Sequence, residues 1–168
     1  FTSSLDMKLY GYALFPRAID LSAYTYIFKS PGGMINSYYY TILTTAIGTI
    51  AGIAFMCGIG YAIARPEYKY KDQLSLFLYI TMLFGGGLVP SYILSANVLQ
   101  LKDTIWSLIL PGMLNAYHVF LLRLFFDNIP SSLIESAKLD GASEFRIFFN
   151  IALPLTKTGI ATITLFNV

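Results

Sequence analysis

The stretch that decides the fold is INSYYYTILTTAIGTIAGIAFMCGIGYAIA, residues 35–64, which contains no charged side chain. A helix that crosses about 30 Å of hydrocarbon needs roughly 20 apolar residues, so this run is long enough to cross even when tilted. The charged segment RPEYKYKD, residues 65–72, follows at once and ends the run. The sequence therefore predicts a transmembrane helix at 35–64.

The composition of the whole chain also indicates a membrane. Of its 168 residues, 56% are hydrophobic and only 12% are charged, about half the charged fraction of typical soluble domains. A soluble fold of this size cannot bury that much apolar surface, so we expect lipid to cover the excess. The net charge of +2 is too small to indicate a nucleic-acid partner. A single cysteine, Cys57, offers neither a disulfide framework nor a metal cluster, and we interpret it as a small hydrophobic residue.

Further apolar runs follow along the chain, at residues 74–94, 105–126 and, as a partial run, 157–168. Gly85-Gly86-Gly87 and Pro90 interrupt the second run, and Pro111 is expected to bend the third. The predicted fold is all-α, a polytopic transmembrane helical bundle. Because the last run is too short to cross a membrane and the chain does not begin with Met, we expect a fragment that is truncated at both ends.

The remaining segments lie outside the predicted spans. Residues 1–34 are mixed in character and form an expected extracytoplasmic segment with a short helix near Ser22–Phe28, whereas residues 35–168 form the transmembrane domain. Basic residues are denser on the side of the loops at 65–71 and 127–156, which contain Arg65, Lys69, Lys71, Lys138 and Arg146. The opposite side carries Lys8, Arg17, Lys29 and Lys102. Since basic loops stay in the cytoplasm, we place the loop at 127–156 there.

This loop, DNIPSSLIESAKLDGASEFRIFFNIALPL at 127–155, predicts two short helices joined by a hinge. Pro130 suits the start of the first helix, and the spacing of Ser132 and Glu135 offers a capping box as an alternative start. Gly141 is predicted to end that helix in the left-handed conformation, and Ser143 to cap the second. Pro154 is predicted to end the second helix. An amphipathic pair lying on the inner leaflet is one interpretation, but the small, polar first helix suits a protein cleft better.

The loop resembles the cytoplasmic EAA loop of permease subunits of binding-protein-dependent ABC importers, whose fold is the MetI-like bundle. The resemblance rests on Glu135-Ser136-Ala137, Asp140-Gly141-Ala142-Ser143 and Leu153-Pro154-Leu155. Ser136 replaces the usual alanine of the motif, and Thr158 stands where these permeases often carry a further proline. Segments elsewhere are similar to the maltose-type, carbohydrate-importing branch, namely Asn36-Ser37, Tyr61–Arg65, Leu108–Pro111, Asn115–Tyr117 and Val119–Arg123.

The resemblance implies that the loop is a coupling helix that docks in a cleft of a separate ATPase subunit. Glu135 would pair with a basic residue of the ATPase, and Gly141 would allow the bend. The implied coupling residues are Glu135, Ser136, Ala137, Asp140, Gly141, Ala142, Ser143, Leu153 and Pro154. The chain itself contains no Gly-x-x-x-x-Gly-Lys-Ser/Thr phosphate loop, so we expect no cofactor on it and ATP on the partner.

The other implied partners are a second permease subunit, expected to be a paralogue, and an extracytoplasmic solute-binding protein. The implied location is the bacterial inner membrane, with the chain crossing it several times. The implied function is transport of sugars or oligosaccharides by alternating access, driven by ATP hydrolysis on another subunit. The sequence does not name the solute.

Four residues inside the predicted spans are candidates for the translocation path. Asn115 and His118 are three residues apart and would share a helix face, where polar groups either line a path or hydrogen-bond neighbouring helices. Gly86 and Pro90 belong to the interrupted second run, which is either a broken helix along the path or a notch for close packing.

Two other classes of membrane protein are alternatives. An ion-coupled secondary transporter usually carries an acidic residue within its spans, and these spans contain none. A polytopic membrane enzyme needs a nucleophile with a base or paired metal ligands, and the chain has one His and one Cys. We therefore expect neither a catalytic residue nor a metal ligand.

Overall fold

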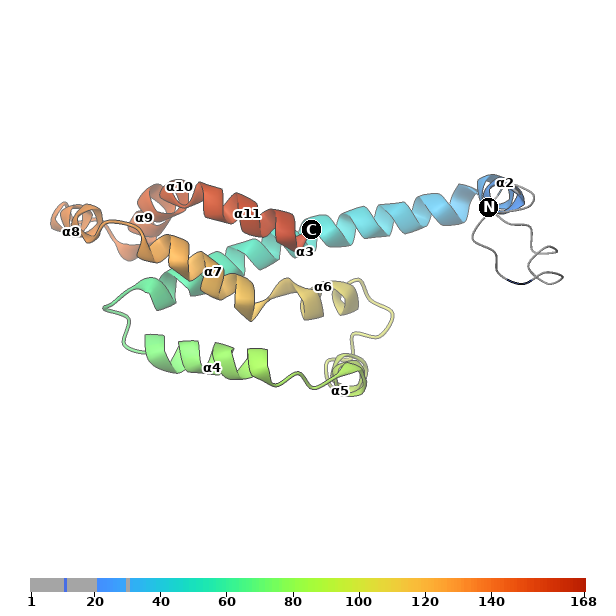
Figure 1. Ribbon diagram of the computed structural model, residues 1–168, viewed down its shortest axis with the longest axis horizontal. Helices are drawn as coiled ribbons and strands as arrows, with labels where there is room; N and C mark the ends of the chain where they lie inside the picture. Colours follow the sequence, from blue (N-terminus) through green and yellow to red (C-terminus); the bar gives the residue numbers. More distant parts are fainter. Residues whose placement is uncertain (1–10, 12–20, 30) are drawn as a thin grey trace. The chain divides into compact units, whose positions relative to one another are not determined.

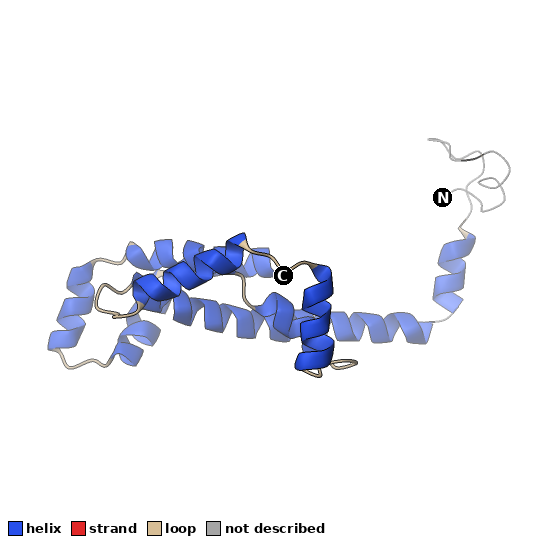
Figure 2. Cartoon of the chain, turned by 90° about the horizontal axis from the view of Figure 1, so that it is seen from below, coloured by secondary structure: helices blue, strands red, loops and turns tan. Residues whose placement is uncertain are grey.

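The computed structural model describes residues 11, 21–29 and 31–168, and all regular structure within them is helical (Figures 1 and 2). The chain divides into two compact units, Phe1–Leu43 and Thr44–Val168. The elements are α2 Ser22–Lys29, α3 Pro31–Ala64, α4 Lys71–Leu83, α5 Leu88–Ile93, η1 Leu94–Val98, α6 Trp106–Met113, α7 Ala116–Asp127, α8 Ser131–Leu139, α9 Glu144–Ile147, η2 Phe148–Ala152, α10 Leu153–Leu155 and α11 Lys157–Asn167. The prediction of an all-α fold is confirmed.

The first unit contains α2 and the beginning of α3. Helix α2 confirms the short helix that the sequence predicts near Ser22–Phe28. Lys8 and Arg17, on which part of the predicted orientation depends, lie outside the described residues.

Helix α3 is the one described helix that is long and apolar enough by itself to cross a membrane, over Gly32–Ala64. Three further candidates are pairs of helices bent at a short break: Lys71–Leu83 with Leu88–Val98 at 116°, Trp106–Met113 with Ala116–Asp127 at 49°, and Glu144–Leu155 with Lys157–Asn167 at 77°. The apolar runs of the sequence thus become helices, but the runs at 74–94 and 105–126 are each divided into two helical parts.

The second unit has a hydrophobic core between α3, α4, α7, η2 and α11. Its buried residues are Met56, Cys57, Tyr61, Ile63, Leu78, Val119, Leu122, Phe126, Ala152 and Ile163. Glycines allow the helices to approach: the nearest neighbour of a Cβ built on Gly60 is the Leu122 Cβ at 3.2 Å, and one on Gly159 would overlap the Phe125 ring. Such close approach at small residues is common where helices pack in membranes.

The break in the first of these pairs, Lys71–Leu83 with Leu88–Val98, was predicted from its glycines. The chain leaves the helix at Phe84, and Gly87 has a φ of 82°, which favours glycine. A Cβ built on Gly85 or Gly87 meets nothing within 4 Å, so no described helix packs closely there.

The bend in the pair Trp106–Met113 with Ala116–Asp127 is not at Pro111, as the sequence predicts, but at Leu114–Asn115. Pro111 lies inside α6, whereas Leu114 and Asn115 are both extended, with φ of −122° and −117°. The Asn115 side chain accepts a hydrogen bond from the Tyr117 N–H at 2.9 Å and so begins a new helix.

Two boundaries in the loop also differ from the prediction. Helix α8 starts at Ser131 after Pro130, without a side-chain cap, so the capping box of Ser132 and Glu135 is not used. Pro154 does not end the second helix, because the wide turn of η2 precedes it and the helical path continues to Leu155. A wide turn moves the carbonyl with which a proline ring would clash. The chain turns at Thr156 instead.

Candidate functional site

Helix α8 presents a mostly polar surface to solvent. Glu135, Ser136 and Asp140 are exposed, and Leu139 is 90% exposed. On the opposite side Ile134 is the one buried residue of the helix, and Ala137 is half-buried. Among the described residues Glu135 has no ion-pair partner. Its carboxylate is therefore available to a partner.

Gly141 ends α8 in the way the sequence predicts. Its φ is 77°, and the Gly141 N–H donates to the Lys138 carbonyl while the Ala142 N–H donates to the Ala137 carbonyl. These two bonds form a Schellman motif, which requires a left-handed residue at this position. Ser143 is extended and its Oγ accepts a hydrogen bond from the Arg146 N–H, so the predicted cap of the second helix is confirmed.

The remaining coupling residues lie close along the chain but differ in exposure. Ala142 is half-buried at the hinge, Leu153 is half-buried in α10, and Pro154 is exposed. The motif therefore places polar residues on the surface of α8 and apolar residues on the segment that returns toward α11.

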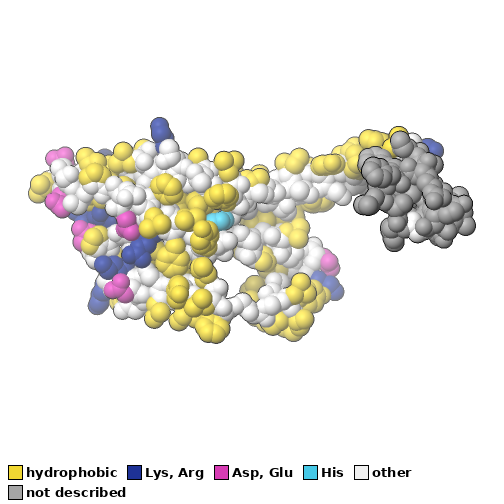
Figure 3. All heavy atoms as spheres, in the orientation of Figure 1, with side chains coloured by type: hydrophobic (Ala, Val, Ile, Leu, Met, Phe, Trp, Pro, Cys, Tyr) yellow, Lys and Arg dark blue, Asp and Glu magenta, His cyan; other side chains and the backbone are white. Residues whose placement is uncertain are grey.

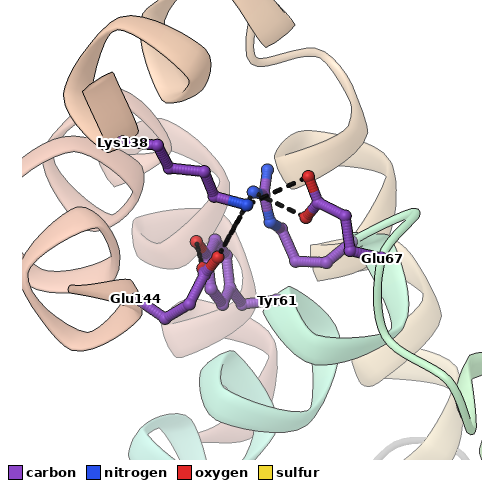
Figure 4. A network of polar contacts seen from close by, with 5 residues as sticks. Tyr61, Glu67, Lys138 and Glu144 are labelled. Carbon is purple, nitrogen blue, oxygen red and sulfur yellow. Dashed lines mark hydrogen bonds and ion pairs between the residues drawn. The ribbon is translucent and has the colours of Figure 1, made fainter. Parts of the chain in front are cut away.

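The structure adds a polar network that the sequence analysis missed. It joins Tyr61 and Arg65 at the end of α3, Glu67 in the following loop, Lys138 of α8 and Glu144 of α9, and is called here the α3–α8 network (Figure 4). The Lys138 Nζ lies 3.0 Å from carboxylate oxygens of both Glu67 and Glu144. Arg65 Nη2 lies 3.0 Å from Glu67 Oε2 and 3.7 Å from Glu144 Oε1.

Tyr61 and Arg65 complete this network from α3. The Tyr61 hydroxyl donates to Glu144 Oε2 at 3.1 Å, and the Arg65 guanidinium lies 5.7 Å from the centre of the Tyr61 ring. The Arg65 side chain is only 11% exposed, and its Nε is buried without a hydrogen-bond partner among the described residues. Such a buried cation needs nearby carboxylates to offset its lost hydration.

The network keeps Lys138 charged. Its hydrogen bonds, to Glu144 first and then to Glu67, raise the pKa of Lys138 above its ordinary value. Because the pKa of Lys138 is raised in the folded state, the stabilisation that its charged form gives the fold is fully present at neutral pH. It is lost only as the pH rises through the pKa of Lys138 in the folded state. The sequence indicates only that the loops at 65–72 and 127–156 both contain acidic residues among basic ones. It does not show which of these side chains meet.

The candidate path residues do not form one group. Asn115 is an exposed cap at the break, and His118 lies in the first turn of the helix that it caps. His118 is half-buried in α7, stacks on Phe166 with ring centres 6.4 Å apart, and has a buried Nδ1 without a partner among the described residues.

Gly86 lies in the other break. It lines a hollow of about 840 Å³ together with Ser91, Ser95 and the Lys102–Asp103 loop. Pro90 is exposed in α5 and is not among the residues that line this hollow.

Charged side chains gather at one end of the second unit. In Figure 3 the acidic and basic side chains of the visible face lie chiefly over α8, α9 and the α3–α4 loop, whereas much of the remaining surface is apolar. A smaller group of acidic and basic side chains lies at the other end of this unit (Figure 3), so the distribution fits a helical bundle in lipid whose ends lie in water.

Residues 54–168 match the family described as binding-protein-dependent transport system inner membrane component. The chain belongs to this family. It is thus part of a multi-pass inner membrane protein, in agreement with its long apolar helix and the resemblance noted in its loop.

Two relatives from Bacillus subtilis (strain 168) are similar over nearly the whole chain. The chain is 40% identical to the polygalacturonan/rhamnogalacturonan transport system permease protein YtcP over 92% of its length, and 36% identical to Protein LplC over 99%. It covers 54% and 56% of those proteins, so it spans about half the length of the curated relatives that it matches.

A solved structure is similar as well. It is the crystal structure of a bacterial ABC transporter involved in the import of the acidic polysaccharide alginate, with a TM-score of 0.80 and 29% identity. The match covers 99% of this chain and 59% of the other. The MetI-like fold expected from the sequence is therefore confirmed.

Proposed function

We propose that this chain is the part of an ABC importer permease subunit that crosses the membrane and binds the ATPase subunit. The observation that carries the proposal is the surface of α8, where Glu135 and Leu139 are exposed beside small residues and Glu135 has no ion pair within the described part of the chain. A helix that lies on lipid buries a continuous apolar face, and the exposed positions of α8 are mostly polar. This surface suits a protein cleft, with residues 127–156 in the cytoplasm.

We assign no chemical step to this chain. ATP hydrolysis belongs in this proposal to separate ATPase subunits, because the chain lacks a phosphate loop. A second permease subunit, expected to be a paralogue, and an extracytoplasmic solute-binding protein complete the assembly. Closure of the ATPases moves α8, and the bundle changes from inward-facing to outward-facing.

We propose oligosaccharides as the class of solute. The names of several relatives support it, since they refer to the transport of polygalacturonan/rhamnogalacturonan, arabinooligosaccharides and galactooligosaccharides. The two breaks supply candidate path residues, Gly86 with Pro90 and Asn115 with His118, because discontinuous helices expose backbone polar groups to a cavity.

The coupling surface is tested by Glu135→Lys and Gly141→Asp in the full-length complex. Glu135→Lys reverses the exposed charge, and a non-glycine residue at a φ of 77° costs about 1 kcal/mol or more. We expect both variants to insert in the membrane, because neither residue lies in lipid, and to lose association with the ATPase or to uncouple hydrolysis from uptake. Copurification of the ATPase and hydrolysis stimulated by the binding protein are the measurements.

Two control variants separate docking from general damage. Asp72→Lys makes the same change of charge at an exposed site in the first turn of α4 and should leave association intact. Gly141→Asn should be milder than Gly141→Asp, because asparagine tolerates the left-handed conformation. Normal association and normal uptake in both Glu135→Lys and Gly141→Asp would refute the proposed function.

A further inference from the structure

Helix α8 is attached to the rest of its unit at two points on one face. Ile134, which is 6% exposed, lines a cavity of about 180 Å³ with Phe126 and Ile129. One turn later, Lys138 pairs with Glu67 and Glu144. Residues four apart lie on the same side of a helix, so these two contacts hold α8 along its length.

The second of these points is electrostatic and leads back to α3. The largely buried Arg65 keeps the carboxylates of Glu67 and Glu144 near the end of α3, and the Tyr61 hydroxyl holds Glu144 as well. Lys138 then bonds to the same two carboxylates (Figure 4). The Lys138 side chain of α8 thus ends on two carboxylates that Arg65 and Tyr61 hold at the end of α3.

Without Lys138, the direction of α8 would depend on its short connections, on the buried Ile134 and on the half-buried Ala137. A single apolar contact constrains position but not direction, because dispersion and hydrophobic contacts are not directional. Charge-assisted hydrogen bonds are directional and stronger than neutral ones. The pairing of Lys138 therefore fixes the direction of α8 relative to the end of α3.

We propose that the α3–α8 network is a positioning device that makes α3 follow α8, so that a displacement imposed on α8 by the ATPase moves the inner end of α3. This inference rests on the proposed function and adds the route by which motion leaves the docking surface. Lys138 is the positioning residue of α8, and it acts through Glu67 and Glu144 without contacting the ATPase.

The test is Lys138→Met in the full-length complex, since methionine keeps the length of the side chain and removes its charge. We expect the ATPase to copurify normally and hydrolysis to continue, while solute transported per ATP falls about five-fold or more, the low end of coupling between sites. The matched control is Arg146→Met. Arg146 is exposed on the same loop and has no ion pair among the described residues, so its loss should leave the ratio unchanged.

A covalent replacement of the ion pair is the second arm. Glu67→Cys with Lys138→Cys, in a Cys57→Ala background, should transport poorly until a short bismaleimide joins the two thiols, and then recover. If the network merely stabilised the fold, the cross-link would not restore the solute transported per ATP. The inference is overturned by an unchanged ratio in Lys138→Met, by loss of ATPase association in that variant, or by a cross-link that leaves transport low. The proposed function fails separately, if the ATPase does not copurify with the unaltered chain.

Discussion

Asn115 holds the break between α6 and α7 through a single side-chain hydrogen bond. Its Oδ1 accepts from the Tyr117 N–H at 2.9 Å, and the residue itself is extended and exposed. The first N–H groups of a helix have no partner within that helix, and a side-chain cap satisfies one of them. A role in capping explains why a polar residue stands in an apolar run without requiring contact with solute.

The capping role predicts a difference between two substitutions at this residue. Asn115→Ala removes the cap and should lower the stability of the purified complex by about 1 kcal/mol, whereas Asn115→Ser keeps an oxygen acceptor and should stay close to the unaltered protein. Thermal unfolding in detergent measures the difference. If instead both variants keep their stability and both change solute preference in uptake, Asn115 lines the path and capping is secondary.

At the scale of elements, glycines decide how closely α3 packs. A Cβ added at Gly52 would overlap the carbonyl oxygen of Met113, at the end of α6. Backbone cannot move aside as the end of a flexible side chain can. Gly58, on the same helix, has nothing within 4 Å of its added Cβ.

Gly52→Ala and Gly58→Ala therefore form a matched pair. Overpacking typically costs about 1–3 kcal/mol, which outweighs the roughly 0.5–1 kcal/mol that alanine gains over glycine within a helix. We expect Gly52→Ala to separate α3 from α6 and to increase proteolysis of the folded protein, and Gly58→Ala to be neutral or stabilising. Equal protease resistance of the two variants would show that α3 and α6 do not pack as described.

At the scale of the whole molecule, the proposed orientation places the α3–α8 network and the loop at 127–156 in the cytoplasm. Lys69, Lys102 and Arg146 are exposed, lie in three different loops and are not members of the α3–α8 network. Each can therefore be replaced by cysteine to test the orientation without removing a network residue. The density of basic residues favours the first and last of these on the cytoplasmic side.

In a Cys57→Ala background, cysteines at Lys69 and Arg146 should react with a membrane-impermeant maleimide only after the cytoplasmic face is opened. A cysteine at Lys102 should react from outside in intact cells. Labelling of Lys69 and Arg146 from opposite faces would contradict both the orientation and the α3–α8 network, since that network joins the same two loops.

The sequence by itself determined the helical, membrane-spanning class, the C-terminal end of α8 and the start of α9. Uncharged runs of sufficient length have few alternatives to helices in lipid, because every backbone polar group must bond within the segment. Gly141 and Ser143 were predictable for a similar reason: a left-handed closing residue and a side-chain cap are local, and their chemistry depends on a few neighbouring positions.

Only the tertiary structure decided where the third apolar run bends and which charges meet. Pro111 disfavours a helix locally, yet it lies inside α6. The bend lies at Leu114–Asn115 instead, where the Asn115 side chain caps the start of α7. The bond between Tyr61 and Glu144 joins residues 83 positions apart. An ion pair or hydrogen bond forms only where the fold brings two groups within a few ångströms, and the packing of α3, α7 and the loop fixes that distance.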